Sequence, residues 1–526
     1  MGRLFFRWGV AAFASTALPT AFAVAVPGER AAGAEATTRP TNRQVEQLVA
    51  QMAEPNPAVR EKARLMMLNL GGDAYEAVEA ELAEPGLSSA VRLVLKAAEP
   101  RLEARARPLA QQKRDDAWER QSLIAEWNRV GHKDPRWNIW VEDGIVNFSR
   151  NAVAARRAAL QNFEKAIGAG CDDAMVLYLR ARSRDPGAET VPDELAEPYR
   201  AAAQAILASN YSAGRKMITL ARYFHVGKDL PADIPADTLI KLAIEASKDS
   251  DVPRSEIWNA MYGISPKLCA KDGWDGDFGR LNPAFQQAFP HQWYAPYFTG
   301  IFNVYWAWNA RGSGWADSVT PQGWRLFEGR IETAQRALQQ AWKLDPMQSA
   351  IYEQMVTVCM AKSDKAGLDL WFRRGIEANP DDYQLCQNKM NALMPRWMGS
   401  HQEMLAFGRE CAATHNHYGS IPQMIVNAHE LISRESPNAE QYVLQPEVWD
   451  DIHQALEDRL LLYPTRHNRS RYVQWAARCG RWEVITPQCR ILGNHPDPAV
   501  FPDPAAYDAI RQKAQEHAPE TGGQTP

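Results

Sequence analysis

The sequence has few cysteines and no Cys-x-x-Cys pair among its 526 residues. Its seven cysteines are Cys171, Cys269, Cys359, Cys386, Cys411, Cys479 and Cys489. An odd number of scattered cysteines leaves at least one thiol unpaired and excludes a disulfide-framework fold. We expect Cys359, Cys386 and Cys411 to be small buried thiols, because they lie in apolar helical stretches. A single bridge between Cys479 and Cys489 stays an open alternative.

The common catalytic motifs are also missing. There is no Gly-x-x-x-x-Gly-Lys-Ser/Thr loop to cradle a phosphate, and no Gly-x-Ser-x-Gly turn to present a nucleophilic serine. His429-Glu430 begins like a zinc-protease helix, but Ser433 stands where the second histidine is required. The sequence therefore predicts no catalytic residue, no metal and no cofactor.

The chain has no excess of positive charge. Its 59 Lys and Arg residues are balanced by 63 Asp and Glu residues, which gives a net charge of −4 and a pI near 6.3. Proteins that bind the phosphate backbone of nucleic acid carry a basic surface. The sequence predicts no nucleic-acid partner.

The chain has one long apolar run, the 17 residues from Val10 to Val26 near the N-terminus, and no other. It follows Arg3 and Arg7 and contains small-residue cleavage sites, which together indicate an export signal over residues 1–25. We therefore expect a periplasmic or secreted protein with a flexible linker over residues 26–42. An uncleaved anchor in the inner membrane is the alternative, and the only membrane contact expected.

Helical periodicity fills most of the remaining chain. The clearest helix is expected after Thr320, a capping residue, with Pro321 in its first turn. Its end at Pro346 and the end of a later helix at Pro380 lie 34 residues apart. This period and the helix pairs around it resemble tetratricopeptide repeats. Ser400 begins a capping box for a further helix.

The N-terminal region has a similar but shorter pattern. Val59-Arg60 and Val91-Arg92 lie 32 residues apart in matching helices, and this stretch resembles HEAT-type repeats. The predicted fold is therefore all-α, a solenoid of helical hairpins with HEAT-like repeats followed by tetratricopeptide-like repeats. The predicted regions are HEAT-like hairpins at 43–105, helical arrays at 106–270 and 321–500, a Trp/Gly-rich insertion at 271–320, and a short helix with a disordered tail at 501–526.

The insertion at 271–320 is the candidate binding region. Trp and Tyr provide large, stiff contact areas with a polar edge, and they concentrate in binding hot spots. Arg311 and Trp315 are expected to be exposed, because Gly312 and Gly314 favour a turn there. The other candidate contacts are Trp308, Trp293, Tyr297 and Trp274. The same aromatics could instead fill the core where a solenoid changes direction, and both interpretations stay open.

Two weaker hypotheses concern chemistry. Asp275 and Asp317 flank the aromatic residues, and paired carboxylates beside aromatics are typical of sugar-cleaving sites. His415-Asn416-His417, with His401 and His429, could offer imidazoles to a metal. This set lacks a Cys or acidic ligand at a fixed spacing, so the sequence favours a solvated loop between helices.

Four stretches resemble a bacterial family of unknown function built on tetratricopeptide-like helices, over residues 106–495 of this chain. They are Gly170-Cys171-Asp172-Asp173, Arg311-Gly312-Ser313-Gly314-Trp315, Pro395-Arg396-Trp397-Met398-Gly399-Ser400 and Phe407-Gly408-Arg409-Glu410-Cys411. The resemblance implies an exported bacterial helical protein and transfers no activity. We expect a non-catalytic scaffold that binds a protein or peptide in the envelope. The alternatives are a glycan-binding or glycan-active protein with a Trp-lined cleft, and a structural spacer without a ligand.

Overall fold

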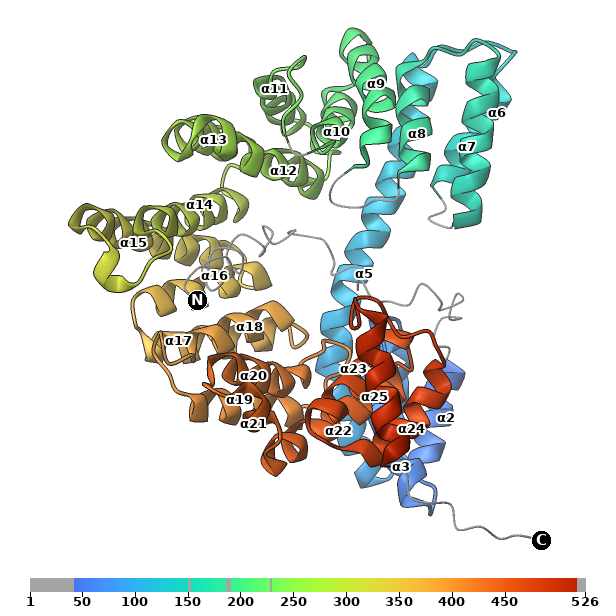
Figure 1. Ribbon diagram of the computed structural model, residues 1–526. Helices are drawn as coiled ribbons and strands as arrows, with labels where there is room; N and C mark the ends of the chain where they lie inside the picture. The colour runs from blue at the N-terminus through green and yellow to red at the C-terminus, as the bar shows by residue number, and fades with distance from the viewer. Residues whose placement is uncertain (1–41, 150–152, 186–190, 228, 518–526) are drawn as a thin grey trace. The chain divides into compact units, whose positions relative to one another are not determined.

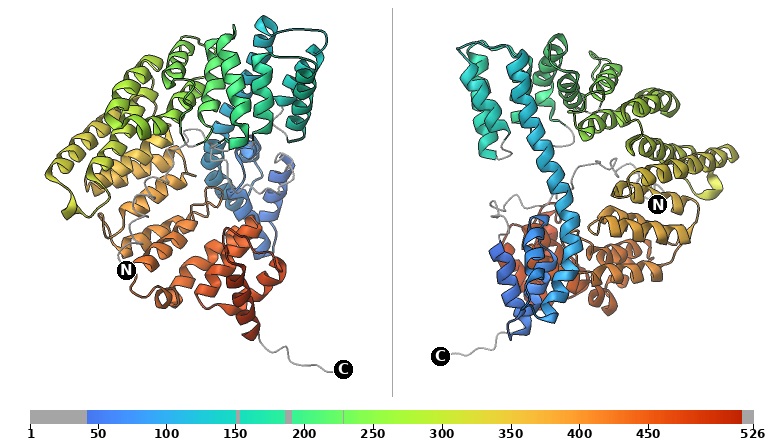
Figure 2. Two further views of the ribbon diagram at one scale, coloured as in Figure 1. Left: turned by 45° about the horizontal axis from the view of Figure 1, so that its top comes forward. Right: turned by 180° about the vertical axis from the view of Figure 1, so that it is seen from behind.

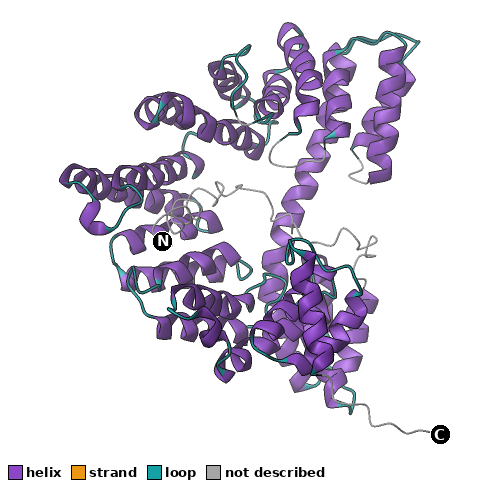
Figure 3. Ribbon diagram, in the orientation of Figure 1, coloured by secondary structure: helices purple, strands orange, loops and turns teal. Residues whose placement is uncertain are grey.

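The protein is described by a computed structural model that covers residues 42–149, 153–185, 191–227 and 229–517 (Figure 1). Within these ranges the chain is helical, and no β-strand is formed (Figure 3). One isolated parallel bridge joins Val191 and Val226. The predicted all-α class is confirmed. The expected export signal, the linker up to residue 41 and the end of the expected tail lie outside the described residues.

The described residues form two compact units. The first contains residues 110–351, and the second combines residues 42–109 with residues 352–517. Two helices run through the divisions, α5 (Ser89–Val130) and α16 (Ser349–Ala361). The predicted boundary between residues 105 and 106 therefore falls inside a continuous 42-residue helix.

The first unit is a row of helices in which each packs against neighbours one or two positions away in the chain (Figure 2). This pattern of local contacts is typical of a solenoid. Its complete helices are α6 (Asn138–Phe148), α7 (Val153–Gly168), α8 (Ala174–Arg184), α9 (Ala196–Ala208), α10 (Ala213–Phe224), α11 (Ala236–Ala246), α12 (Arg254–Asp272), α13 (Trp274–Ala288), α14 (Tyr294–Arg311) and α15 (Pro321–Leu344). Short 3₁₀ turns are η3 (Asp193–Leu195) and η4 (Ala316–Ser318).

The second unit contains the N-terminal hairpins and the C-terminal array. Its N-terminal elements are α2 (Asn42–Met52), α3 (Pro57–Leu68), η2 (Gly72–Ala74) and α4 (Tyr75–Ala83). Its C-terminal elements are α17 (Lys365–Ala378), α18 (Tyr383–Ala392), α19 (His401–Ala413), α20 (Gln423–Glu435), α21 (Ala439–Val443), α22 (Pro446–Leu462), α23 (Arg466–Arg478), α24 (Trp482–Leu492) and α25 (Pro504–Glu516). In the array, α18 also packs on α20 and α20 on α22, so the solenoid pattern recurs.

The two chain segments of the second unit are joined by a buried polar contact that the sequence did not predict. Arg105 of α5 donates to both carboxylate oxygens of Asp381, at 2.8 and 3.0 Å, and to Asn416 Oδ1 at 2.9 Å. The same guanidinium donates to the main-chain carbonyls of Leu68 and Leu70. The N-terminal hairpins therefore hold the loop between α19 and α20.

The cysteines are buried, as predicted for Cys359, Cys386 and Cys411. Six of the seven are described, and all six are free and buried. Burial raises the pKa of the Cys359 thiol to about 12. Cys479 and Cys489 are also free thiols in this structure. Among the described helices, none combines the length and the apolar character that crossing a bilayer requires.

Candidate functional site

Most of the expected insertion at 271–320 forms helices of the solenoid, chiefly α13 and α14. Trp258 of α12 is the centre of an aromatic cluster, with its ring 6.2 Å from that of Trp293 and 5.7 Å from that of Tyr297. Trp293 and Tyr297 are buried in this cluster. Both are therefore core residues, because their rings fill the space between α12 and α14. Neither lines an accessible surface.

Trp274 lies at the start of α13 and is half-buried. Its ring and that of Phe302 pack in a T-shaped arrangement, with 5.2 Å between the ring centroids. Phe302 in turn packs against Phe278 and Trp306. Trp274 is therefore part of the aromatic packing between α13 and α14, at its solvent-facing end, and is not an isolated surface residue.

The loop between α14 and α15 carries one accessible aromatic side chain. Trp315 is 75% exposed on this loop. Arg311 ends α14 and donates to the main-chain carbonyl of Gly314 at 2.9 Å, which fixes the loop beside it. Gly312 has φ of 76°, a left-handed conformation that favours glycine. The turn expected from these glycines is therefore formed.

Arg311 is also held by two indole rings. Its guanidinium carbon lies 5.6 Å from the ring centroid of Trp308 and 5.5 Å from that of Trp324. Burial lowers the pKa of Arg311 from its usual value. These residues and the exposed Trp315 form what we call the Trp315 surface: Trp308, Arg311, Trp315 and Trp324.

Asp275 and Asp317, the two carboxylates considered for a sugar-cleaving site, do not form a shared site. Asp275 is exposed, and its Oδ1 lies 3.9 Å from an Arg330 nitrogen. Arg330 itself stacks on Trp306, at 3.7 Å from the ring centroid, and donates to that residue's main-chain carbonyl. Asp317 is exposed in η4. Each carboxylate is a surface group, and neither is buried in an aromatic-lined cleft.

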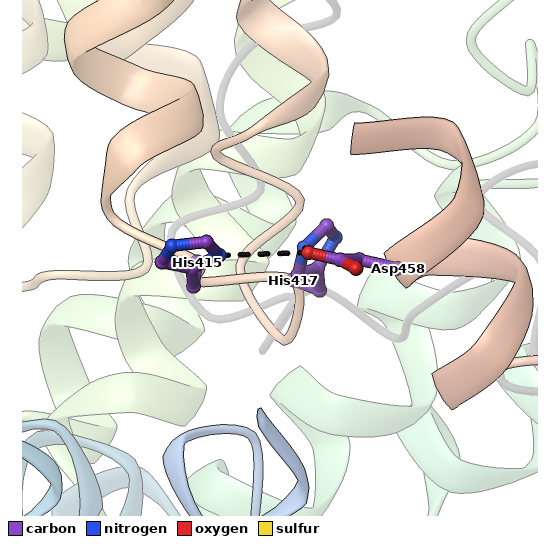
Figure 4. A group of neighbouring side chains, drawn as sticks. All are labelled: His415, His417 and Asp458. Atoms are coloured by element: carbon purple, nitrogen blue, oxygen red, sulfur yellow. Dashed lines mark ion pairs between the residues drawn. The ribbon is translucent and has the colours of Figure 1, made fainter. Parts of the chain in front are cut away.

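The loop of His415, Asn416 and His417 differs from the solvated loop that the sequence favoured. Asn416 is 2% exposed and His417 is 1% exposed. Asp458 of α22 lies beside both histidines, with its Oδ2 3.5 Å from His415 Nδ1 and 3.5 Å from His417 Nε2 (Figure 4). The acidic group that the sequence did not reveal is thus supplied by another helix. No local signal could have found it, because it lies 41 residues after His417.

His401 and His429 do not join this cluster. His401 Nε2 lies 3.1 Å from Glu435 Oε2. His429 is buried, with Nδ1 2.8 Å from the Tyr442 hydroxyl and Nε2 3.0 Å from Asp451 Oδ2. Burial lowers the pKa of His429. Both nitrogens of His429 have partners, so this residue is a satisfied core histidine.

The comparisons with known proteins found fold similarity alone. No protein-family model matches the chain, and no curated protein matches it. Among solved structures it is similar to the human IFIT1 dimer with m7Gppp-AAAA, at 11% identity and a TM-score of 0.31, covering 89% of this chain and 94% of that one. It is also similar to the APC/C hetero-tetramer Cut9-Hcn1, at 10% identity and a TM-score of 0.25, covering 88% of this chain and 85% of that one.

Proposed function

We propose that the protein is a non-catalytic helical-repeat scaffold of the bacterial envelope that binds a protein or peptide partner through the Trp315 surface. Stacked helical hairpins present extended surfaces and commonly bind other chains, although the fold alone names no partner. The single observation that carries the proposal is the exposure of Trp315 on a loop that Arg311 fixes.

The composition of this surface supports a protein partner. Trp and Arg are the residues most enriched in binding hot spots, because they combine large contact area with directional polar groups. Arg311 is already held between Trp308 and Trp324, so little side-chain entropy is lost when a partner docks. A partner segment with an apolar anchor next to a carboxylate matches an exposed indole beside a guanidinium.

A glycan ligand is the second candidate, because the exposed Trp315 indole stands two residues before the exposed Asp317 carboxylate. The burial of Trp293 and Tyr297 counts against the aromatic cleft that this alternative requires. Scaffold binding therefore has the stronger support. Export rests on the sequence of residues 1–25, and N-terminal sequencing of the protein from fractionated cells tests it.

Affinity capture from envelope extract tests the proposal. The wild-type mature chain is compared with the double variant Arg311→Ala/Trp315→Ala and with Ile491→Ala, a matched control that removes another exposed apolar side chain. We expect a protein that is recovered by the wild type and the control and lost by the double variant. Equal recovery by all three chains would remove the Trp315 surface as the site. Recovery of a polysaccharide in place of a protein would support the glycan candidate.

A further inference from the structure

The loop between α19 and α20 is held in a fixed conformation by residues of the N-terminal hairpins. Asn69 donates to the main-chain carbonyl of His415 at 3.0 Å and accepts from the Tyr418 amide at 2.8 Å. Arg101 donates to the Thr414 carbonyl at 3.0 Å. Side chains on this loop are therefore pre-positioned before any ligand binds, which lowers the entropic cost of binding.

His415 adopts an unusual backbone conformation on this loop. Its φ is 51°, in the left-handed region that few non-glycine residues occupy. The His417 amide donates to the His415 carbonyl at 3.1 Å. This tight turn brings the two imidazoles to the same side of the loop, where Asp458 meets them (Figure 4). Strained residues concentrate at functional sites, and the strain at His415 serves the convergence of these side chains.

The spacing of the three side chains suits a metal ion. One ligand atom from each of His415, His417 and Asp458 lies within 4.8 Å of the others. Bonds of about 2.0–2.1 Å to a tetrahedral zinc ion place its ligand atoms about 3.3 Å apart. The two nitrogen-to-oxygen distances of 3.5 Å are close to this value. The His415 side chain is 33% exposed and has room to turn toward the ion.

His417 provides a second, independent observation. It is almost fully buried, yet neither of its ring nitrogens has a hydrogen-bond partner among the described residues. An unsatisfied buried polar group costs roughly 1–3 kcal/mol, so native proteins rarely keep one without a reason. Nε2 faces Asp458 Oδ2 at a distance too long for a good hydrogen bond. A bound ion would satisfy it.

The surroundings of the cluster position the carboxylate and add charge. Gln454 donates to Asp458 Oδ1 at 2.7 Å, which leaves Oδ2 directed at the imidazoles. Such outer hydrogen bonds orient the ligands of metal sites. Glu61 of α3 interacts electrostatically with His415 and Asp458 and is paired with Arg64. Arg459 donates to the main-chain carbonyl of His417. It is the Arg of α22, and its positive charge is opposite in sign to that of Asp458 on the same helix.

We propose that His415, His417 and Asp458 form a binding site for a divalent transition-metal ion of the zinc class. Two imidazoles and one carboxylate are the ligand set of such ions, whereas Mg²⁺ and Ca²⁺ prefer oxygen ligands alone. Three protein ligands leave a fourth position for water or an exogenous group, on the side where His415 is exposed. The ion joins α22 to the loop that the N-terminal hairpins hold. This proposal is independent of the Trp315 surface, which lies in the other unit.

Zinc binding by the full-length chain tests the site. The purified protein is stripped of metal with a chelator, and Zn²⁺ is then titrated by calorimetry, with the melting temperature measured with and without the ion. We expect one Zn²⁺ per chain and a higher melting temperature in its presence. Absence of binding by the wild type would overturn the proposal.

Two variants with a matched control locate the binding. His415→Asn removes one ligand with a residue that tolerates the left-handed conformation, and Asp458→Asn removes the carboxylate charge. Each should weaken Zn²⁺ binding at least about 100-fold, since even outer-shell changes cost 10–100-fold. His401→Asn makes the same change at a half-exposed histidine outside the cluster and should bind like the wild type.

Circular dichroism shows whether each metal-free variant is folded. This control is needed because an unfolded variant would lose Zn²⁺ binding whether or not the substituted residue is a ligand. His415→Asn should melt close to the metal-free wild type. If folded His415→Asn binds Zn²⁺ as tightly as the wild type, the assignment is wrong. Co²⁺ gives a second measurement, since it should show absorption typical of nitrogen and oxygen ligands. A thiolate charge-transfer band would assign the ion to a cysteine and overturn the site.

Discussion

Arg105 joins the two chain segments of the second unit through a single guanidinium. It is 4% exposed, pairs with both oxygens of Asp381, and lies 4.1 Å above the ring of Tyr418. Removing one partner of a buried ion pair leaves the other charge uncompensated and costs about 3–5 kcal/mol. The stability of the loop at 414–420 therefore depends on this residue.

We predict that Arg105→Ala lowers the free energy of unfolding of the second unit by about 3 kcal/mol or more. Urea unfolding measures the loss, and hydrogen exchange at residues 414–420 shows whether the loop is released. Arg136→Ala is the control, because Arg136 pairs with Asp134 on the surface and its loss should leave the urea midpoint unchanged. An Arg105→Ala chain with wild-type midpoint and loop protection would contradict this role.

Glu256 has an unfavourable environment in the first turn of α12. A helix N-terminus favours a carboxylate, but burial and the nearby Glu119 and Asp115 raise the pKa of Glu256 to about 7. The folded chain then binds more protons than the unfolded chain between the usual pKa of 4.5 and about 7. The contribution of Glu256 to the free energy of unfolding is therefore present at low pH and is lost as the pH rises through 7.

Glu256→Gln should therefore stabilise the first unit at pH 8, by up to about 3 kcal/mol, and have little effect near pH 4.5. Thermal unfolding at the two pH values measures the difference. Glu245→Gln, at an exposed position of α11, should change stability by less than about 0.5 kcal/mol at either pH. A Glu256→Gln effect that is the same at both pH values would refute the assigned cause.

At the scale of helices, local signals predicted several starts correctly. Thr320 caps α15 by accepting from the Gly323 amide at 3.0 Å, and Pro321 follows in the first turn. Ser400 caps α19 by accepting from the Glu403 amide. Capping residues act within one turn, so the sequence alone contains the needed information.

The long helix α5 was not predicted. It continues through Pro100 and Pro108, although proline normally removes a helix hydrogen bond and ends the helix. Leu95 and Leu102 on the same helix are fully buried in the N-terminal core. Tertiary packing of this kind outweighs the local cost of proline and cannot be read from local sequence.

Gly408 allows α19 and α20 to approach closely. A Cβ atom added there would lie 2.9 Å from Ile425 Cα, which belongs to the backbone of α20. We predict that Gly408→Ala destabilises the second unit by about 1–3 kcal/mol through overpacking, although Ala is the better helix former. Urea unfolding measures this loss.

Gly329 of α15 is the matched control, because an added Cβ would meet nothing within 4 Å. Gly329→Ala should raise stability by up to about 1 kcal/mol through helix propensity. If both substitutions stabilise the chain, the close approach at Gly408 does not constrain the helix pair.

At the scale of the whole molecule, the sequence predicted the helical class and left the long-range pairing unknown. Periodicity reports which face of a helix is apolar, but not which distant segment covers it. The pairing of Arg105 with Asp381 joins residues 276 positions apart. The cluster of His415, His417 and Asp458 depends on the stacking of α22 beside the loop. For the same reason, the sequence could not tell which predicted binding residues are buried and which are exposed. Trp293 is buried and Trp315 is exposed because of tertiary packing alone.

The proposed scaffold role depends on contact between the exposed indole of Trp315 and a partner protein in the cell envelope. Site-specific photo-crosslinking in living cells detects such a contact, with a photoactivatable phenylalanine analogue placed at Ser313 beside the intact Trp315, or at Leu93 or Ile491, all of them exposed positions. We expect a discrete protein adduct from position 313 and none from the other two. No adduct at 313, or the same adducts at all three positions, would contradict the proposed role.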